Sequence, residues 1–151
     1  MLSKKTQYAL RAMISLAHEL PGQPIMIAAL AEKEQIPKKF LELILLDLKS
    51  IGVVQSKKGK QGGYYLCRKP AEIKLGHIMR GIEGPLALLP CVSLTAYERC
   101  EGCKDERTCG LRLVMKDVRD QTAKILDNTS LADVMERVER EKAAPEVMFH
   151  I

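Results

Sequence analysis

The stretch IAALAEKEQIPKKFLELILLDLKS, residues 27–50, predicts two short helices separated by a tight turn. The first helix, about 27–34, turns Leu30 and Ala31 inward, and a brief turn follows at Gln35-Ile36. Pro37 is expected at the first position of the second helix, where its missing N–H costs nothing. That second helix gathers its large apolar residues on one face: Phe40, Leu41, Ile44, Leu45 and Leu48. Two short helices around a tight turn form a helix-turn-helix, whose second helix normally enters the major groove of DNA.

The segments on either side extend this pattern. A helix is expected from near Ser3 to just before Pro21, because apolar residues recur at spacings of three and four. After the helix-turn-helix, two β-prone runs at 53–56 and 64–67 flank a glycine-rich link, which predicts a hairpin. Lysines in this link suit a wing that follows a phosphate backbone or enters a minor groove. The alternative is an ordinary exposed hairpin whose lysines serve solubility.

The balance of charged residues changes just after the predicted hairpin. Residues 1–69 hold 12 Lys/Arg and 5 Asp/Glu, whereas residues 70–151 hold 12 and 14. A basic part joined to a near-neutral part is typical of a nucleic-acid-binding module with a second, non-binding element. A solvated, lysine-rich surface would give the same balance, so charge alone leaves both interpretations open.

Beyond the hairpin the sequence predicts three more helices. A short amphipathic one ends at Gly84-Pro85, and a last one begins with a capping signal at Ser130 and Asp133. Between them, a long helix from about 109 to 128 carries an apolar stripe: Leu111, Val114, Met115, Val118, Thr122 and Ile125. A helix this long in a small chain often packs against its own copy, although it can also fold back on its own domain. Residues 143–151 are expected to be a flexible tail.

Four cysteines cluster in a polar, turn-rich segment before the long helix: Cys91, Cys100, Cys103 and Cys109. The spacing Cys100-x2-Cys103-x5-Cys109 suits a metal site or a redox sensor. Open alternatives are zinc, a disulfide between Cys100 and Cys103, or cysteines without a role. Neighbouring arginines and a lysine would favour thiolates. Cys67, in the second strand of the hairpin, is expected to be buried and inert.

Other functions find less support. No apolar run approaches the roughly 18–20 residues that cross a bilayer, and no secretory signal precedes the first helix, so we expect a cytoplasmic protein without a membrane partner. His18, His77 and His150 are scattered, with no catalytic constellation, so we expect no enzyme. A small oxidoreductase using Cys-x2-Cys remains an alternative, although the motif does not open a helix after a strand. A protein-binding adaptor is another.

Several motifs together resemble one family. The runs SKKTQYALRAM at 3–13, IPKKFLE at 36–42, GGYYL at 62–66 and EGPL at 83–86 resemble the Rrf-two family of bacterial winged-helix regulators. The resemblance covers about residues 1–135. It implies a homodimer, paired through the long helix, that binds partly palindromic double-stranded DNA operators. The family includes iron–sulfur, nitric-oxide, iron and cysteine-metabolism regulators.

The resemblance also assigns residues. It places the recognition helix at 37–50 and the wing at 57–64, with an acidic residue that discriminates between operators at Glu42; a carboxylate can accept from the cytosine amino group. The expected DNA-binding residues are Lys4, Lys38, Lys39, Glu42, Lys57, Lys58, Lys60, Gln61, Gly62, Gly63 and Tyr64. It further implies an iron–sulfur cluster, 2Fe-2S or 4Fe-4S, on Cys100, Cys103 and Cys109. The gap of two residues departs from the familiar two five-residue gaps, and Arg112 stands where one member has a histidine ligand. Cys91 is therefore the candidate fourth ligand, with a carboxylate or a partner-chain group as alternatives.

The sequence thus predicts a mainly α protein with a small β wing. We expect a winged helix-turn-helix DNA-binding domain at 1–84, a cysteine-rich sensor loop at 85–109, and dimerisation and terminal helices at 110–142. The expected function is that of a transcriptional regulator, acting as a repressor, which senses iron–sulfur, redox or nitric oxide status. A cluster-free thiol-based or cysteine-metabolism regulator is the alternative.

Overall fold

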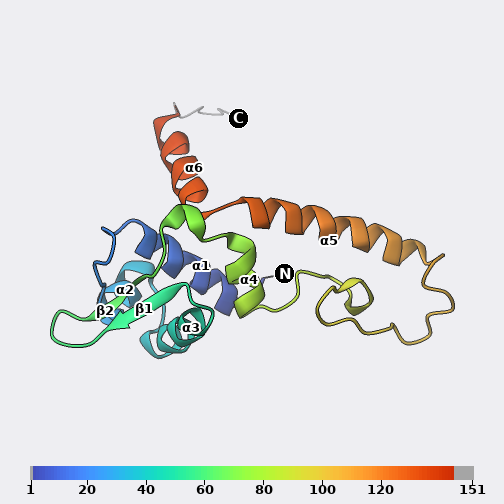
Figure 1. The fold of residues 1–151 in the computed structure, drawn as a ribbon, viewed down its shortest axis with the longest axis horizontal. Helices are drawn as coiled ribbons and strands as arrows, with labels where there is room; N and C mark the ends of the chain where they lie inside the picture. The colour runs from blue at the N-terminus through green and yellow to red at the C-terminus, as the bar shows by residue number, and fades with distance from the viewer. Residues whose placement is uncertain (1, 145–151) are drawn as a thin grey trace, which may run out of the picture.

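Residues 2–144, which this computed structural model describes, form helices and a single antiparallel hairpin (Figure 1). In chain order the elements are α1 (Lys4–Ala17), α2 (Ile27–Glu34), α3 (Lys38–Ser50), β1 (Val54–Lys57), β2 (Gly63–Leu66), the 3-10 turn η1 (Pro70–Glu72), α4 (Leu75–Ile82), the 3-10 turn η2 (Pro90–Val92), α5 (Gly110–Asn128) and α6 (Leu131–Ala143). The predicted fold class, mainly α with a small β wing, is confirmed.

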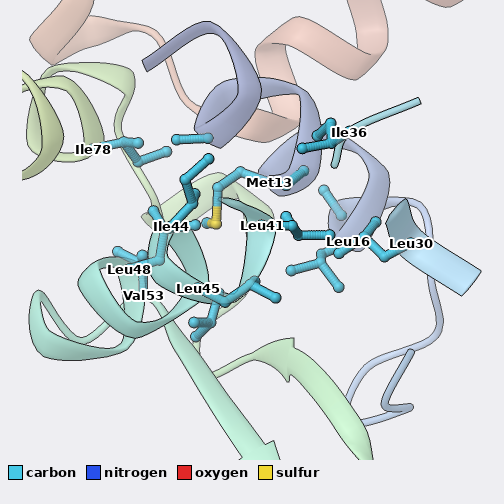
Figure 2. Close-up of a cluster of buried hydrophobic side chains, with 14 of the residues drawn as sticks. Met13, Leu16, Leu30, Ile36, Leu41, Ile44, Leu45, Leu48, Val53 and Ile78 are labelled. Carbon is cyan, nitrogen blue, oxygen red and sulfur yellow. The ribbon is translucent and has the colours of Figure 1, made fainter. Parts of the chain in front are cut away.

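One buried cluster joins α1, α2, α3, α4 and α6. Met13 and Leu16 from α1 face the apolar side of α3, and Leu30 from α2 closes one end (Figure 2). Ile78 and Leu131 bring α4 and α6 into the same cluster. Each such side chain contributes about 1.5–3 kcal/mol when it leaves water. The helix-turn-helix is therefore held from behind by the rest of the chain, and its outer side is left free.

The turn between α2 and α3 follows the sequence prediction with one difference. Gln35 adopts a left-handed conformation with φ 52°, and the Ile36 N–H then donates to the Ala31 carbonyl at 2.9 Å. Pro37 is the N-cap of α3, one position before the first helical residue where it was expected. Its carbonyl accepts from Phe40 and Leu41, both at 2.9 Å, so proline still starts the helix without an unsatisfied donor.

The hairpin is shifted by one residue from its predicted bounds. Lys57 pairs with Gly63 and Val54 with Leu66. Ile25 exchanges two hydrogen bonds with Tyr64, at 2.9 and 2.8 Å, so the chain entering α2 also pairs with β2. Gly63 has φ 153°, and an added Cβ would overlap the Ile25 carbonyl. A glycine is needed there because the backbones meet where a side chain would stand.

Cys67 differs from its predicted place. It lies just past β2 and is half-buried, and its thiol donates to the Gly52 carbonyl at 2.8 Å. It is thus neither in the strand nor fully buried, because β2 ends at Leu66 where the chain bends away.

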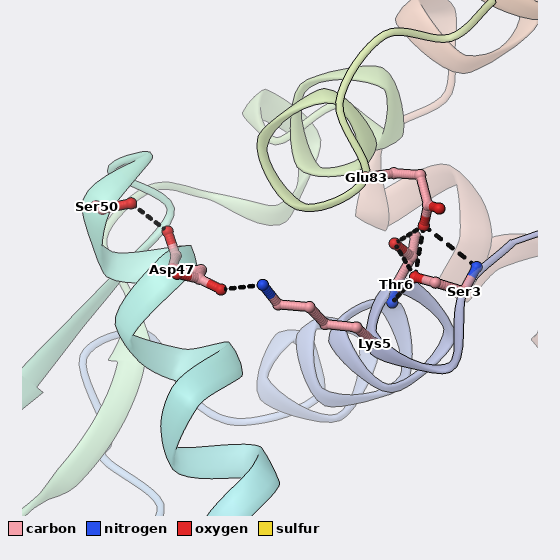
Figure 3. A network of polar contacts seen from close by, with 6 residues as sticks. All are labelled: Ser3, Lys5, Thr6, Asp47, Ser50 and Glu83. Carbon is pink, nitrogen blue, oxygen red and sulfur yellow. Dashed lines mark hydrogen bonds and ion pairs between the residues drawn. The ribbon is translucent and has the colours of Figure 1, made fainter.

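The start of α1 is tied to the end of α4 by a polar network. Ser3 caps α1 by accepting from the Thr6 N–H at 3.2 Å. The Glu83 carboxylate accepts from the Ser3 hydroxyl at 2.6 Å, from the Ser3 N–H at 3.2 Å, and from the Thr6 hydroxyl (Figure 3). These hydrogen bonds, the one from the Ser3 hydroxyl foremost, lower the pKa of Glu83. On the other side of α1, Lys5 pairs with Asp47 of α3 at 2.6 Å.

The loop after α4 runs out from this body, α5 runs back toward it as a projecting arm, and α6 follows at the body (Figure 1). At the base of the arm, Arg80 of α4 donates two hydrogen bonds to the Asp127 carboxylate, at 2.5 and 2.9 Å. Ser130 and Asp133 then form the predicted capping box. The Leu131 N–H donates to the Ile73 carbonyl at 3.0 Å. Helix α6 runs through Ala143, the first residue of the predicted tail; residues 145–151 lie outside the described residues.

Candidate nucleic-acid interface and cysteine loop

Most of the predicted DNA-binding residues meet on one side of the body. A hollow of about 370 Å³ opens between the start of α2, the first turns of α3, and the hairpin. Predicted residues that line it are Lys38, Glu42, Lys57, Gly62, Gly63 and Tyr64. A neighbouring hollow of about 440 Å³ adds Lys60 and Gln61. A helix and a lysine-bearing wing thus share one concave, basic surface, which is the shape and charge that a phosphate backbone requires.

Three predicted residues lie outside these hollows. Lys39 is exposed on the outer side of α3, and Lys58 is exposed near the tip of the hairpin. Lys4 is exposed at the start of α1 and shares neither hollow. A DNA-binding role for each of these residues stays a prediction.

Sequence reasoning missed other residues of this surface. Met26, 54% exposed, lies beside Lys57 in both hollows. Leu43 and Leu46 also stand exposed on α3, although they line neither hollow. The signal was present in the sequence, since both leucines fall outside the face made by Leu41, Ile44, Leu45 and Leu48.

The four clustered cysteines line one cavity. It measures about 390 Å³ and lies where the loop meets the start of α5. Cys91, in η2, is buried, whereas Cys100 and Cys103 are half-buried on the loop, and Cys109 is the N-cap of α5. The structure therefore brings Cys91 to the other three across a sequence gap of eight residues.

Cys91 and Cys100 line this cavity together. A hydrogen bond with Cys100, followed by burial, raises the pKa of the Cys91 thiol. Within residues 2–144, no three cysteine, histidine or acidic side chains converge on a point that would hold a metal ion. The donor set fits a thiolate-bound cluster in type and number, and the loop must close further to bring all four sulfurs onto it.

Two arginines of α5 hold the Cys91 segment. Arg112 Nε donates to the Cys91 carbonyl at 3.2 Å, and Arg119 Nη1 donates to the Val92 carbonyl at 2.5 Å. On the loop itself, Arg99 donates to the Cys103 carbonyl at 2.9 Å. Tyr97 donates to the Glu106 carboxylate at 2.5 Å, and this hydrogen bond raises the pKa of Tyr97. The contacts of Arg112 and Arg119 link the loop to α5, and no sequence motif pointed to them.

Helix α5 exposes the stripe predicted for dimerisation. None of its residues is buried. Val114 and Ile125 are 57% and 60% exposed, Leu111 and Val118 are also exposed, and Met115 and Thr122 are half-buried. Contiguous exposed apolar faces are typical of interaction sites, and dimerisation through this one stays a prediction. Among residues 2–144, no helix is long and apolar enough to cross a membrane.

A helix-turn-helix followed by a two-stranded wing defines the winged-helix class of DNA-binding proteins. The family model described as an iron-dependent transcriptional regulator, Rrf2, matches residues 2–137. The chain belongs to the Rrf2 family of transcriptional regulators.

Individual relatives agree with this assignment. The chain is 39% identical over 138 residues to a putative HTH-type transcriptional regulator, rrf2-like, of Rhodobacter capsulatus, covering 89% of this chain and 92% of that one. Among solved structures, CymR of B. subtilis, described as its global cysteine regulator, matches with a TM-score of 0.74 and 28% identity, over 91% of this chain and 97% of that one. IscR of T. potens matches with a TM-score of 0.73 and 27% identity, over 99% and 96%. The Rhodobacter relative is named as a transcriptional regulator and CymR as a cysteine regulator.

Proposed function

We propose that this chain is a homodimeric, sequence-specific DNA-binding repressor whose cysteine loop holds an iron–sulfur cluster. The main support for the cluster is that one cavity at the start of α5 is lined by Cys91, Cys100, Cys103 and Cys109. The match to a family described as iron-dependent supports it. A bound cluster would supply chemistry sensitive to oxygen, nitric oxide and iron supply.

The residues around the cavity suit thiolate ligands. Cys109 is the N-cap residue of α5, so its sulfur lies at the positive end of the helix dipole. Arg112 lines the same cavity, and its charge acts to lower the pKa of Cys91 against the effects of burial and Cys100. We assign Cys100, Cys103 and Cys109 as ligands, with Cys91 as the fourth.

DNA binding is assigned to the basic surface of α3 and the wing. Lys38, Lys57 and Lys60 provide positive charge beside Glu42, the residue we propose to discriminate between operators. Arg112 and Arg119 connect the loop to α5, so ordering of the loop would bias the position of α5. A ligand changes DNA affinity only by favouring one geometry over another. Because half-sites lie about one helical turn apart, the spacing of two α3 helices in a dimer is the quantity that such a bias would change.

The test of the cluster is purification without oxygen, followed by visible absorption and iron and sulfide analysis. We expect bound iron and sulfide, lost or destabilised in each variant Cys91→Ala, Cys100→Ala, Cys103→Ala and Cys109→Ala. Cys67→Ala is the matched control, because Cys67 lies outside the cavity and bonds to Gly52. Protein that stays colourless and iron-free after reconstitution with iron and sulfide would rule out the cluster.

A cluster-free thiol switch is the second candidate, favoured by the position of Cys91 and Cys100 in one cavity. Two thiols and one peroxide molecule give a disulfide and two water molecules. Similarity to a cysteine regulator supports this alternative. Peptide mass spectrometry after peroxide treatment of the iron-free protein would identify the pair; a Cys91–Cys100 or Cys100–Cys103 disulfide that changes DNA affinity would establish the switch.

A further inference from the structure

Two leucines stand on the outer face of α3, away from the core. Leu43 and Leu46 are 57% and 55% exposed. Lys39, Leu43, Leu46 and Ser50 follow one another at spacings of four, three and four, so they form a stripe along the helix. The opposite face packs into the body through Leu41, Ile44, Leu45 and Leu48, each 0% exposed. Core packing therefore does not explain leucine at positions 43 and 46.

Positive charge flanks this apolar pair on the side of α3 that faces the wing. Lys38 and Lys39 lie in the first turn of α3, and Lys49, near its end, donates to Ser56 of β1 at 2.8 Å. The wing adds Lys57, Lys58 and Lys60, all exposed. Asp47, the acid nearest the end of the stripe, pairs with Lys5 of α1 at 2.6 Å. Glu42, one turn from Leu46 on the same helix, is the acid beside the pair. The result is an apolar centre flanked on the wing side by lysines and by the carboxylate proposed to discriminate between operators.

The major groove of DNA offers the complementary pattern. Its two edges carry phosphates, and the 5-methyl groups of thymine project from its floor. An apolar partner protein would match the leucines and leave the lysines on the wing side without anions. The charge around the leucines therefore favours duplex DNA as the occupant of this face.

We infer that Leu43 and Leu46 recognise thymine, by packing their methyl groups against thymine 5-methyl groups in the operator. The inference rests on the proposed function, since it requires α3 to enter the major groove. It assigns an apolar part of sequence recognition to α3, beside the polar part proposed for Glu42. Burial of one methyl group is worth about fourfold in affinity, so two or more such contacts would give about tenfold or more.

The experiment replaces thymine by deoxyuridine, which keeps every hydrogen-bonding group and lacks only the methyl. The duplex is one that the full-length dimer selects from a random pool, and each thymine in a half-site is replaced in turn. For the wild type we expect affinity to fall about fourfold at one or more positions. Leu43→Ala and Leu46→Ala should bind more weakly and should each lose the response at the position that leucine contacts. Both side chains are exposed, so both variants should fold.

Val138→Ala is the matched control. Val138 is 39% exposed on α6, which lies on the other side of the body from α3 (Figure 1). It should keep both the affinity and the deoxyuridine response. A wild type that binds its selected duplex and tolerates deoxyuridine at every position would overturn this inference alone. A protein that selects no duplex would overturn the proposed function, and this inference with it.

Discussion

The body of the molecule and its arm are built on different principles. In the body, which comprises α1–α4, the hairpin and α6, helices converge on one cluster whose larger members are 0–4% exposed (Figure 2). In the arm, which comprises the loop 85–109 and α5, no residue of the long helix is buried, and the loop is held by hydrogen bonds from a few side chains. The body thus has a core of its own, although Leu43 and Leu46 stay exposed on it, whereas the arm leaves its apolar stripe exposed. The fold resides in the first region and the proposed regulation in the second.

The body and the arm should differ most in how much a leucine-to-alanine substitution lowers the free energy of unfolding. Leu45→Ala removes a side chain that is 0% exposed in the body, so we expect the free energy of unfolding to fall by about 2–5 kcal/mol. Leu113→Ala on α5, where leucine is 49% exposed, should cost less than about 1 kcal/mol. Urea denaturation followed by circular dichroism, at one protein concentration, measures both. Equal losses would mean that the arm has a core of its own.

Assembly should depend on the arm. Val118→Glu places a charge within the exposed stripe of α5, and we expect it to weaken self-association at least about 100-fold, because an unpaired charge in an apolar interface is strongly unfavourable. Sedimentation velocity at micromolar concentration should show a dimer for the wild type and a monomer for the variant. Lys116→Glu lies on the opposite side of α5 and should remain dimeric. A monomeric wild type would contradict the dimer proposal.

DNA affinity should depend on the body. Replacing Lys57, Lys58 and Lys60 together by Ala should weaken binding to all duplexes alike and reduce the slope of log affinity against log salt by up to about 3. Fluorescence anisotropy titrations between low and moderate salt would measure that slope. Replacing Lys116, Lys124 and Lys142 together removes the same charge outside the basic surface and should leave the slope nearly unchanged. Unchanged affinity in the wing variant would remove the wing from the interface.

The smallest effect on stability should come from the hydrogen bonds of Glu83, which lies just before the arm. The pKa of Glu83 is lowered by its hydrogen bonds to Ser3 and Thr6. Its contribution to stability is therefore fully present above the unfolded pKa of about 4.3 and is lost as pH falls through the lower, folded value. Glu83→Gln should cost below about 1 kcal/mol at neutral pH, since the site is exposed. Stability curves of the two proteins should converge below pH 4.3; parallel curves would show that this carboxylate does not contribute.

The local sequence pattern predicted the helices and strands well. It did not predict the contacts between residues that lie far apart in the chain. Apolar spacing gave α2 at Ile27–Glu34, and capping residues gave the start of α6 at Ser130. The hairpin is also paired with Ile25 through Tyr64, a contact across 39 positions that no local signal encodes. The same limit applies to Glu83 and Ser3, which lie 80 positions apart.

The residues of the candidate sites also fall into two groups, those identified from the sequence and those whose contacts only the structure shows. Residue type and spacing identified the cysteines and the lysines, because metal and phosphate binding require particular chemical groups. Arg112 and Arg119 act through backbone carbonyls of the Cys91 segment, and such contacts depend on geometry alone. Leu43 and Leu46 were visible as residues outside the buried face, but only the structure shows how basic their surroundings are.

Helix α5 is also a lever. Its 19 residues span about 28 Å, with Asp127 fixed to Arg80 at one end and Cys109 at the other. A rotation of about 10° at the fixed end would displace the cysteine end by about 5 Å, nearly one turn of an α-helix. Conversely, a displacement of several ångström at the cysteine sulfurs would rotate the other end of α5 by only a small angle. That end contacts α4, which packs on α1 and α3. The arm would thus reduce a coarse movement at the sensing end to a fine adjustment beside the helices that face DNA.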